Sequence, residues 1–240
     1  MGRINNVKRM FINLNRAKIL NYIGNYTTLI HLEIMFHDGI INFNFFEKLI
    51  NLEDIRIICN IGDLELDGEI INLKCINNFK KLKQLHLKGC KFEIEDIENL
   101  TQLEILSLHL CNIQDEDIYK LSKLTNLIIF NMSNNKIRIN VDFIINNFTK
   151  LEVLDISYTG INPNDYIKFK KLTTLKALIY EGMIDHNYEM YIEEELENEL
   201  TIDLYSNEYD NVFIDIIEYY DKYNKYVSCC KYNKYVSCCK

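Results

Sequence analysis

The sequence predicts an α/β solenoid, a stack of repeated units with short parallel strands on one side and 3₁₀ or short helical turns on the other. Counted from the first residue of each unit, apolar side chains recur at that residue, three residues later and five residues later in eight consecutive units. Spacing by two within the triplet is typical of a strand, whose alternate side chains face the same way. The eight triplets are Val7/Met10/Ile12, Leu29/Leu32/Ile34, Leu52/Ile55/Ile57, Leu82/Leu85/Leu87, Leu103/Leu106/Leu108, Leu127/Phe130/Met132, Leu151/Leu154/Ile156 and Leu175/Leu178/Tyr180.

The residues before each strand follow a different period. Apolar residues stand six and three positions before the first residue of seven units. Spacing by three predicts a 3₁₀ or short helical turn that points one side inward. These pairs are Ile23 and Tyr26, Phe46 and Leu49, Ile76 and Phe79, Ile97 and Leu100, Leu121 and Leu124, Ile145 and Phe148, and Phe169 and Leu172.

A third regularity lies eight residues after the start of each unit, where the strand should end. All but one of the side chains there are small and polar, a thiol or a histidine. Turned inward, such a side chain can satisfy backbone groups of the turn that would be costly to bury unpaired. The residues are Asn15, His37, Asn60, Cys90, Cys111, Asn135, Thr159 and the exception Met183.

This pattern, L-x-x-L-x-L-x-x-N-x-I at spacings of 21 to 24 residues, resembles the leucine-rich repeat family. The run LKQLHLKGCKFEIEDIENLTQLEILSLHLCNI, residues 82–113, is most similar to its internalin-like and phosphatase-regulator-like branch. The resemblance implies a curved solenoid with the parallel sheet on its concave face. Units of this kind stack because none can bury its apolar face alone.

We expect three segments along the chain. Residues 1–184 form the solenoid of about eight repeats, interrupted by an insertion at residues 60–70 that is either a recognition loop or a tolerated excursion. Residues 185–221, with thirteen acidic and no basic side chains, form a cap or a surface for a basic partner; LTIDLY, residues 200–205, could be a last strand. Residues 222–240 repeat KYNKYVSCC in tandem and are expected to be disordered.

Composition and signals favour an intracellular protein. The chain has 240 residues, 48% hydrophobic and 26% charged, with a bias typical of an AT-rich genome such as that of a large DNA virus, a protist or a low-GC bacterium. Neither a secretory signal nor a membrane span is evident, so we expect a cytoplasmic location, in the host if the source is viral, and mostly free thiols. Glycosylation-type triplets point the other way; they begin at Asn25, Asn99, Asn131 and Asn147.

Catalytic and cofactor motifs are not found, and we expect no enzymatic activity, cofactor, metal or small-molecule substrate. His86 and His109 should point outward from adjacent strands and could hold a metal, but no third ligand is evident and ordinary surface histidines are favoured. Cys90 and Cys111, at the same inward place of adjacent units, should be neighbouring buried thiols of low reactivity.

The residues between the apolar triplets should face solvent on the concave side. One row is Phe11, Glu33, Arg56, His86, Ser107, Asn131, Asp155 and Ile179, and the next includes Met35, Ile58, Lys88, His109, Ser133, Ser157 and Glu181. Exposed Phe11, Met35, Phe36, Ile58 and Tyr158 are candidate anchors for a partner, since aromatic and flexible apolar groups dominate interfaces. Charges of both signs on this face argue against nucleic acid, which needs concentrated positive charge.

The interpretation that follows is a protein-interaction module with a macromolecular partner of unknown identity on its concave face. Two alternatives rest on the family resemblance. The chain could select substrates for a ubiquitin ligase or regulate a phosphatase, although no F-box is recognisable. It could instead be a secreted or surface adhesin, as internalins are.

Overall fold

The computed structural model describes residues 7–14, 23–36, 41–59, 69–180 and 201–202. The described residues all belong to one compact unit, Met1–Leu204. The tandem tail and most of the acidic segment lie outside the described residues. The predicted boundaries between solenoid, cap and tail therefore stay predictions.

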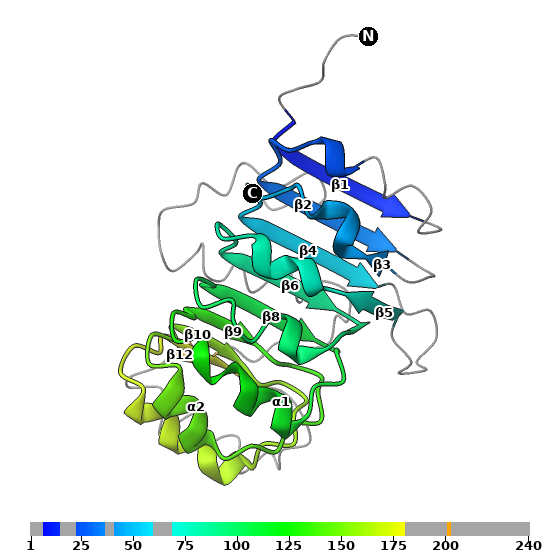
Figure 1. The fold of residues 1–240 in the computed structure, drawn as a ribbon. Coiled ribbons are helices and arrows are strands. Elements are labelled where there is room, and N and C mark those ends of the chain that lie inside the picture. The colour runs from blue at the N-terminus through cyan, green and yellow to red at the C-terminus, as the bar shows by residue number, and fades with distance from the viewer. Residues whose placement is uncertain (1–6, 15–22, 37–40, 60–68, 181–200, 203–240) are drawn as a thin grey trace, which may run out of the picture. The chain divides into compact units, whose positions relative to one another are not determined.

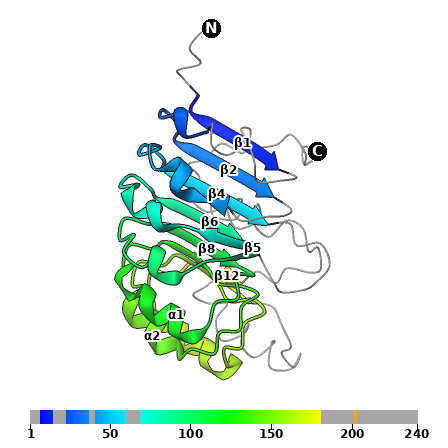
Figure 2. The ribbon, with the colours of Figure 1, turned by 45° about the vertical axis from the view of Figure 1, so that its right-hand side comes forward.

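Nine described strands form one parallel sheet, and their order in the sheet follows their order along the chain (Figures 1 and 2). The first eight coincide with the eight predicted triplets, and the ninth lies within the predicted last strand at residues 200–205. The predicted class, an α/β solenoid with a parallel sheet, is confirmed. The strands are β1 (Arg9–Leu14), β2 (His31–Phe36), β4 (Asp54–Cys59), β6 (Gln84–Lys88), β8 (Ile105–His109), β9 (Ile129–Asn131), β10 (Val153–Asp155), β11 (Ala177–Ile179) and β12 (Thr201–Ile202).

A second, smaller parallel sheet follows the turns of three units. Its strands are β3 (Ile41–Asn42), β5 (Glu69–Asn72) and β7 (Cys90–Lys91). The insertion predicted at residues 60–70 is described only at its end, where Glu69 and Ile70 belong to β5 and pair with β7. The end of the predicted loop is therefore a strand.

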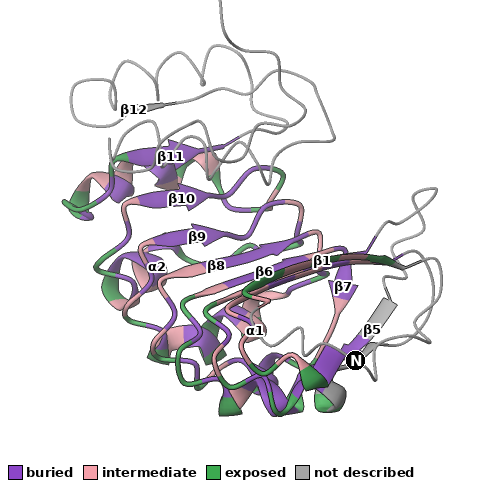
Figure 3. Cartoon of the chain, turned by 90° about the horizontal axis from the view of Figure 1, so that it is seen from above, coloured by how far each residue is buried: buried purple, intermediate pink, exposed green. Residues whose placement is uncertain are grey.

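The described helical elements lie on one side of the main sheet, as predicted from the period of three (Figure 3). They are short, because each must turn the chain back within one unit. They are η2 (Phe43–Phe46), η3 (Lys74–Asn78), η4 (Ile94–Asp96), α1 (Asp115–Lys120), η5 (Leu121–Lys123), α2 (Val141–Asn147) and η6 (Pro163–Lys171).

The core lies between the sheet and the helical turns. From the second unit on, every triplet residue is at most 5% exposed, as are most of the apolar residues that precede the strands. The first triplet, Val7, Met10 and Ile12, is partly buried and packs against this core. Each unit thus buries its triplet between its neighbours, and an end unit has a neighbour on one side.

Among the described turns, the predicted chemistry is most complete at Asn135, whereas Asn15, His37, Asn60 and Met183 lie outside the described residues. The Asn135 side chain donates to the carbonyls of Leu108, Met132 and Ser133 and accepts from the backbone N–H groups of Cys111 and Ile113, over 2.6–3.1 Å. In the next unit the Thr159 hydroxyl donates to the Ile156 carbonyl at 2.7 Å. These side chains supply the hydrogen bonds that the buried turn lacks.

The residue just before this turn side chain has a left-handed backbone in four consecutive units. Gly89, Leu110, Asn134 and Tyr158 have φ between 51° and 66°. This conformation turns the N–H groups of the first three toward the next unit, where they donate to the carbonyls of His109, Ser133 and Ser157. The positive φ values therefore belong to the repeat, and only the glycine adopts one without steric cost.

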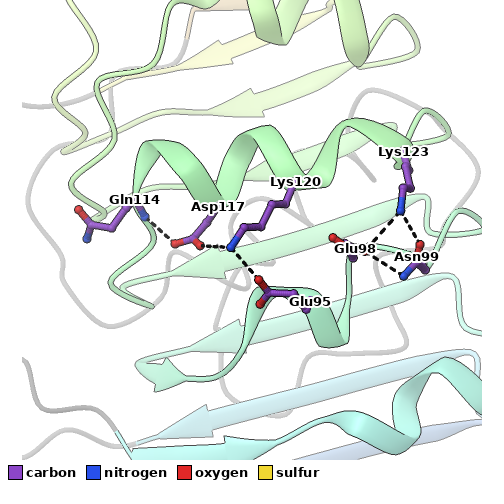
Figure 4. A network of polar contacts seen from close by, with 7 residues as sticks. All are labelled: Glu95, Glu98, Asn99, Gln114, Asp117, Lys120 and Lys123. Atoms are coloured by element: carbon purple, nitrogen blue, oxygen red, sulfur yellow. Dashed lines mark hydrogen bonds and ion pairs between the residues drawn. The ribbon is translucent and has the colours of Figure 1, made fainter.

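Polar contacts also link units on the helical side (Figure 4). Lys120 of α1 contacts Glu95 of η4 at 2.7 Å, and Lys123 contacts Glu98 at 3.3 Å and the Asn99 side chain at 2.8 Å. All lie at the surface, where such pairs contribute little to stability. They help to fix the register between neighbouring units.

We expect Asn135→Ala to lower the free energy of unfolding by at least about 3 kcal/mol, because it leaves several buried donors and acceptors without partners. Asn126→Ala, which removes an exposed bond to the Thr101 carbonyl, should cost less than about 1 kcal/mol. Urea denaturation of both variants measures the difference. Equal losses would contradict the role given to Asn135.

We expect Asn134→Ala to cost about 1 kcal/mol and Asn134→Gly to cost almost nothing, because alanine disfavours the left-handed conformation. Loss of side-chain contacts alone would not make the glycine variant more stable than the alanine variant. Urea denaturation under the same conditions is the measurement. An alanine variant as stable as the glycine variant would show that the turn relaxes.

Candidate protein-interaction site

The strand register places the predicted outward rows side by side. Across the sheet, Phe11 pairs with Glu33, Glu33 with Arg56, and Arg56 with His86. The row continues through Ser107, Asn131 and Asp155 to Ile179. The strand register therefore aligns these eight residues across the sheet, although their exposure differs along the row.

The concave face is open to solvent over β1, β2 and β4. Phe11 is 60% exposed, and the other residues of this part are partly exposed. Parallel strands lie about 4.8 Å apart, so these side chains form one surface. We call this surface the open patch; it comprises Phe11, His31, Glu33, Met35, Asp54, Arg56 and Ile58.

A charged cluster occupies the centre of the open patch. His31 Nδ1 lies 2.7 Å from Asp54 Oδ2, and Arg56 donates to both oxygens of the same carboxylate at 3.1 and 3.3 Å. Glu33 lies 3.7 Å from His31 Nε2. These four side chains are 16–21% exposed. The cluster is thus held in place by its own contacts yet remains accessible.

The cluster keeps its charges at neutral pH. Burial alone would lower the pKa of His31, but hydrogen bonds to Asp54 and Glu33 outweigh it and raise the pKa to about 8. Burial would raise the pKa of Asp54, but the His31 hydrogen bond and the Arg56 charge lower it to about 2. At pH 7, His31 is therefore protonated and Asp54 is ionised.

The two predicted outward rows do not include the pair of His31 and Asp54. His31 and Asp54 stand two residues after the start of their units, in a third outward row that also contains Arg9 and Gln84. The sequence could have predicted this contact, since a histidine and an aspartate occupy the same place in adjacent units.

The concave face is closed over β6 to β11, and here the predicted exposure is wrong. The side chains are buried at 1–7% exposure although they occupy outward positions of the strands. Alternation along a strand fixes which side a residue faces and not what lies against it. These residues are His86, Ser107, His109, Asn131, Ser133, Asp155, Ser157 and Ile179.

Apolar residues explain part of this closure. The third outward row is charged or polar on the first four strands and apolar from β8 onward. Its residues are Arg9, His31, Asp54 and Gln84, followed by Ile105, Ile129, Val153 and Ala177. The last three are at most 3% exposed and lie outside the core cluster on the opposite side of the sheet. Both faces of β9, β10 and β11 are therefore buried.

Some polar groups of the closed part bind one another. Asn131 Oδ1 accepts from the Ser133 hydroxyl at 2.6 Å, and the same hydroxyl lies 2.9 Å from His109 Nδ1. Burial, with the nearby charge of Lys88, lowers the pKa of His109 to about 4, and burial with the charge of Arg56 lowers that of His86 to about 3. Both rings are neutral at pH 7.

The remaining predicted residues fall in three classes. Tyr158 is 41% exposed at the strand-end turn, as predicted, and Lys88 is partly exposed. Phe36 was predicted as an exposed anchor and is fully buried, because β2 continues to this residue and strand alternation turns it inward. Glu181 lies outside the described residues.

Other predicted features have the following outcomes. Cys90 and Cys111 are buried free thiols, as predicted, and burial raises the pKa of each well above its ordinary value. Within the described residues no group of three or more His, Cys, Asp or Glu side chains is arranged so that it could hold a metal ion. No helix in the described ranges is long and apolar enough to span a membrane.

Asn131 is 1% exposed and cannot carry a glycan in the folded chain.

Comparison with known proteins identifies the fold. No protein-family model and no curated protein sequence matches the chain. An internalin from Listeria monocytogenes matches with a TM-score of 0.57 and 18% identity over 76% of this chain, which spans 49% of the internalin's length. TLR13, in a complex with the RNA ssRNA13, matches with a TM-score of 0.52 and 22% identity over 84% of this chain and 28% of its own length. The chain therefore has the leucine-rich repeat fold, with similarity to internalins.

Proposed function

We propose that this protein is a non-enzymatic interaction module that binds a protein partner on the open patch. The observation that carries the proposal is the exposed Phe11 ring beside the charged cluster of β2 and β4. Buried aromatic anchors supply much of the energy of protein interfaces, and charges around them select the partner. The repeat fold supports a binding role in general.

The chemistry of the patch favours particular partner groups. Arg56 has five N–H donors, of which two bind Asp54 among the described contacts. An incoming carboxylate or carbonyl can meet the remaining donors, while Phe11, Met35 and Ile58 can cover apolar side chains. We therefore expect a partner segment that combines an apolar residue with an acceptor.

RNA is a weaker candidate for this chain, even though TLR13 is in a complex with RNA. On the open patch Glu33 and Asp54 oppose the positive charges of His31 and Arg56. Phosphate binding depends on positive charge that is not neutralised in this way. The test below nevertheless separates RNA from protein.

We expect a photoreactive residue at position 11 to label a partner, and the same residue at position 50 to label none. Phe11 and Ile50 are similarly exposed, at 60% and 56%, but Ile50 lies in the turn between η2 and β4. The full-length variants are irradiated in extract of the native cell, and labelled products are identified by mass spectrometry. Arg56→Met in the position-11 variant should reduce labelling at least fivefold.

Equal labelling from both positions would contradict the assignment of the face. A labelled product removed by nuclease and not by protease would replace the protein partner with RNA. Circular dichroism of each variant controls for unfolding.

Three of the histidines, His31, His86 and His109, give a stability profile with a maximum near pH 6.5. The His31 pKa is raised to about 8, so its stabilisation is complete below pH 6.5 and lost as the pH rises through 8. The pKa values of His86 and His109 are lowered to about 3 and 4. The stabilisation that these two histidines contribute is therefore complete above pH 6.5 and lost as the pH falls.

We expect the free energy of unfolding to fall by about 1–2 kcal/mol between pH 6.5 and 9, because His31 then loses its proton. Urea denaturation across pH 4.5–9 measures it. His31→Gln should flatten the alkaline side of the profile, and His109→Gln the acidic side. A His31→Gln profile that keeps the alkaline decline would show that another group causes it.

A further inference from the structure

Two sulfur atoms from neighbouring units lie unusually close together in the core. Cys59 Sγ is 2.8 Å from Cys90 Sγ, and the two residues are 4% and 0% exposed. A disulfide bond measures about 2.05 Å, so the atoms would have to approach by about 0.75 Å. Both are free thiols in the structure.

The pair forms because the two units end their strands differently. Cys59 stands seven residues after the start of its unit, and alternation along β4 points its side chain inward. Cys90 stands eight residues after the start of the next unit, and the turn before it directs its side chain inward as well. In the next unit Cys111 also points inward, but its Sγ donates to the carbonyls of Leu87 and His109 at 3.4 Å. Cys59 is therefore the sulfur that Cys90 faces at close range.

We propose that Cys59 and Cys90 are a disulfide-forming pair, a site of reversible covalent modification within the solenoid. The oxidant is a low-molecular-weight disulfide such as oxidised glutathione. One cysteine thiolate attacks it and releases one thiol, and the second cysteine displaces the other thiol from the mixed disulfide. Overall, two protein thiols become one S–S bond and one glutathione disulfide becomes two glutathione thiols.

Burial determines when this reaction takes place. The raised pKa of Cys90 leaves little thiolate in the folded chain, and a bulky mixed disulfide does not fit a fully buried site. Exchange therefore occurs while the chain folds or opens, and the finished bond is protected from reductants. The chain holds the dithiol in a reducing compartment and the disulfide in an oxidising one.

The bond would link Cys59, which precedes the inserted segment, to β7, the strand with which the end of that segment pairs. Cys59 ends β4 and immediately precedes residues 60–68, and Glu69, which follows them, pairs with Cys90 in the small sheet. A disulfide would thus hold the start of the insertion close to the strand that pairs with its end. It would also tie β4, which carries Arg56 and Ile58 of the open patch, to the next unit.

The test is refolding of the reduced full-length chain with and without oxidised glutathione, followed by alkylation in denaturant and tryptic mapping. We expect peptide 57–74 joined to peptide 89–91, with a mass about 2 Da below the sum of the two thiol peptides. The oxidised protein should have a thermal midpoint roughly 5–10 °C higher, as expected for a bond that closes this loop.

Cys75 and Cys111, both buried, are the internal controls and should be alkylated under both conditions. Cys59→Ala should abolish the cross-link and the thermal shift, whereas Cys111→Ala should keep both. If Cys59→Ala does not fold, Cys59→Val replaces it, and the wild-type map stands by itself. Full alkylation of Cys59 and Cys90 after oxidative refolding, or a bond from Cys90 to Cys111, would overturn the proposal.

Discussion

The burial of each apolar triplet between neighbouring units is the constraint on which the structure depends. A single unit has too little apolar surface to hold itself together, so every strand must stack on the next in register. Leu85, for example, can be fully buried only because Ile55 and Leu106 flank it in adjacent strands. This leaves three outward positions in each unit, and most of what distinguishes one unit from another is confined to them and to the turn that follows.

The end of the strand creates two kinds of unit. In the second and third units the strand continues for one more residue, which turns Phe36 and Cys59 inward. From the fourth unit to the seventh, the residue at that position takes a left-handed backbone and ends the regular ladder. The longer strands lie next to the small second sheet, and they bring the Cys59 thiol to Cys90. The backbone conformation at this one position therefore decides whether its side chain reaches the core.

Strands, helical turns and the core could all be predicted from the sequence, because they follow from short periods that repeat eight times. Asn135 could be predicted as well, since the turn needs a side chain that both donates and accepts. The solvent exposure of the outward side chains could not be predicted. Arg56 and His86 occupy the same outward position in adjacent units, yet the Arg56 side chain is 19% exposed and His86 is 3% exposed. Periodicity gives the direction of a side chain, whereas exposure depends on what packs over it.

The third outward row nevertheless contains this information in its composition. It is charged or polar from Arg9 to Gln84 and apolar from Ile105 to Ala177, and the change falls between β6 and β8, one strand after the closed part of the concave face begins. An apolar row on an outward face is stable only when it is covered, because exposing it to water costs free energy in proportion to its area. In the closed part some polar groups bind one another, as Ser133 does with Asn131, whereas Ser107 Oγ and Asn131 Nδ2 are buried without a hydrogen bond among the described contacts. The charges of His31, Glu33 and Arg56 remain partly exposed, and it is on these strands that the proposed partner can be recognised.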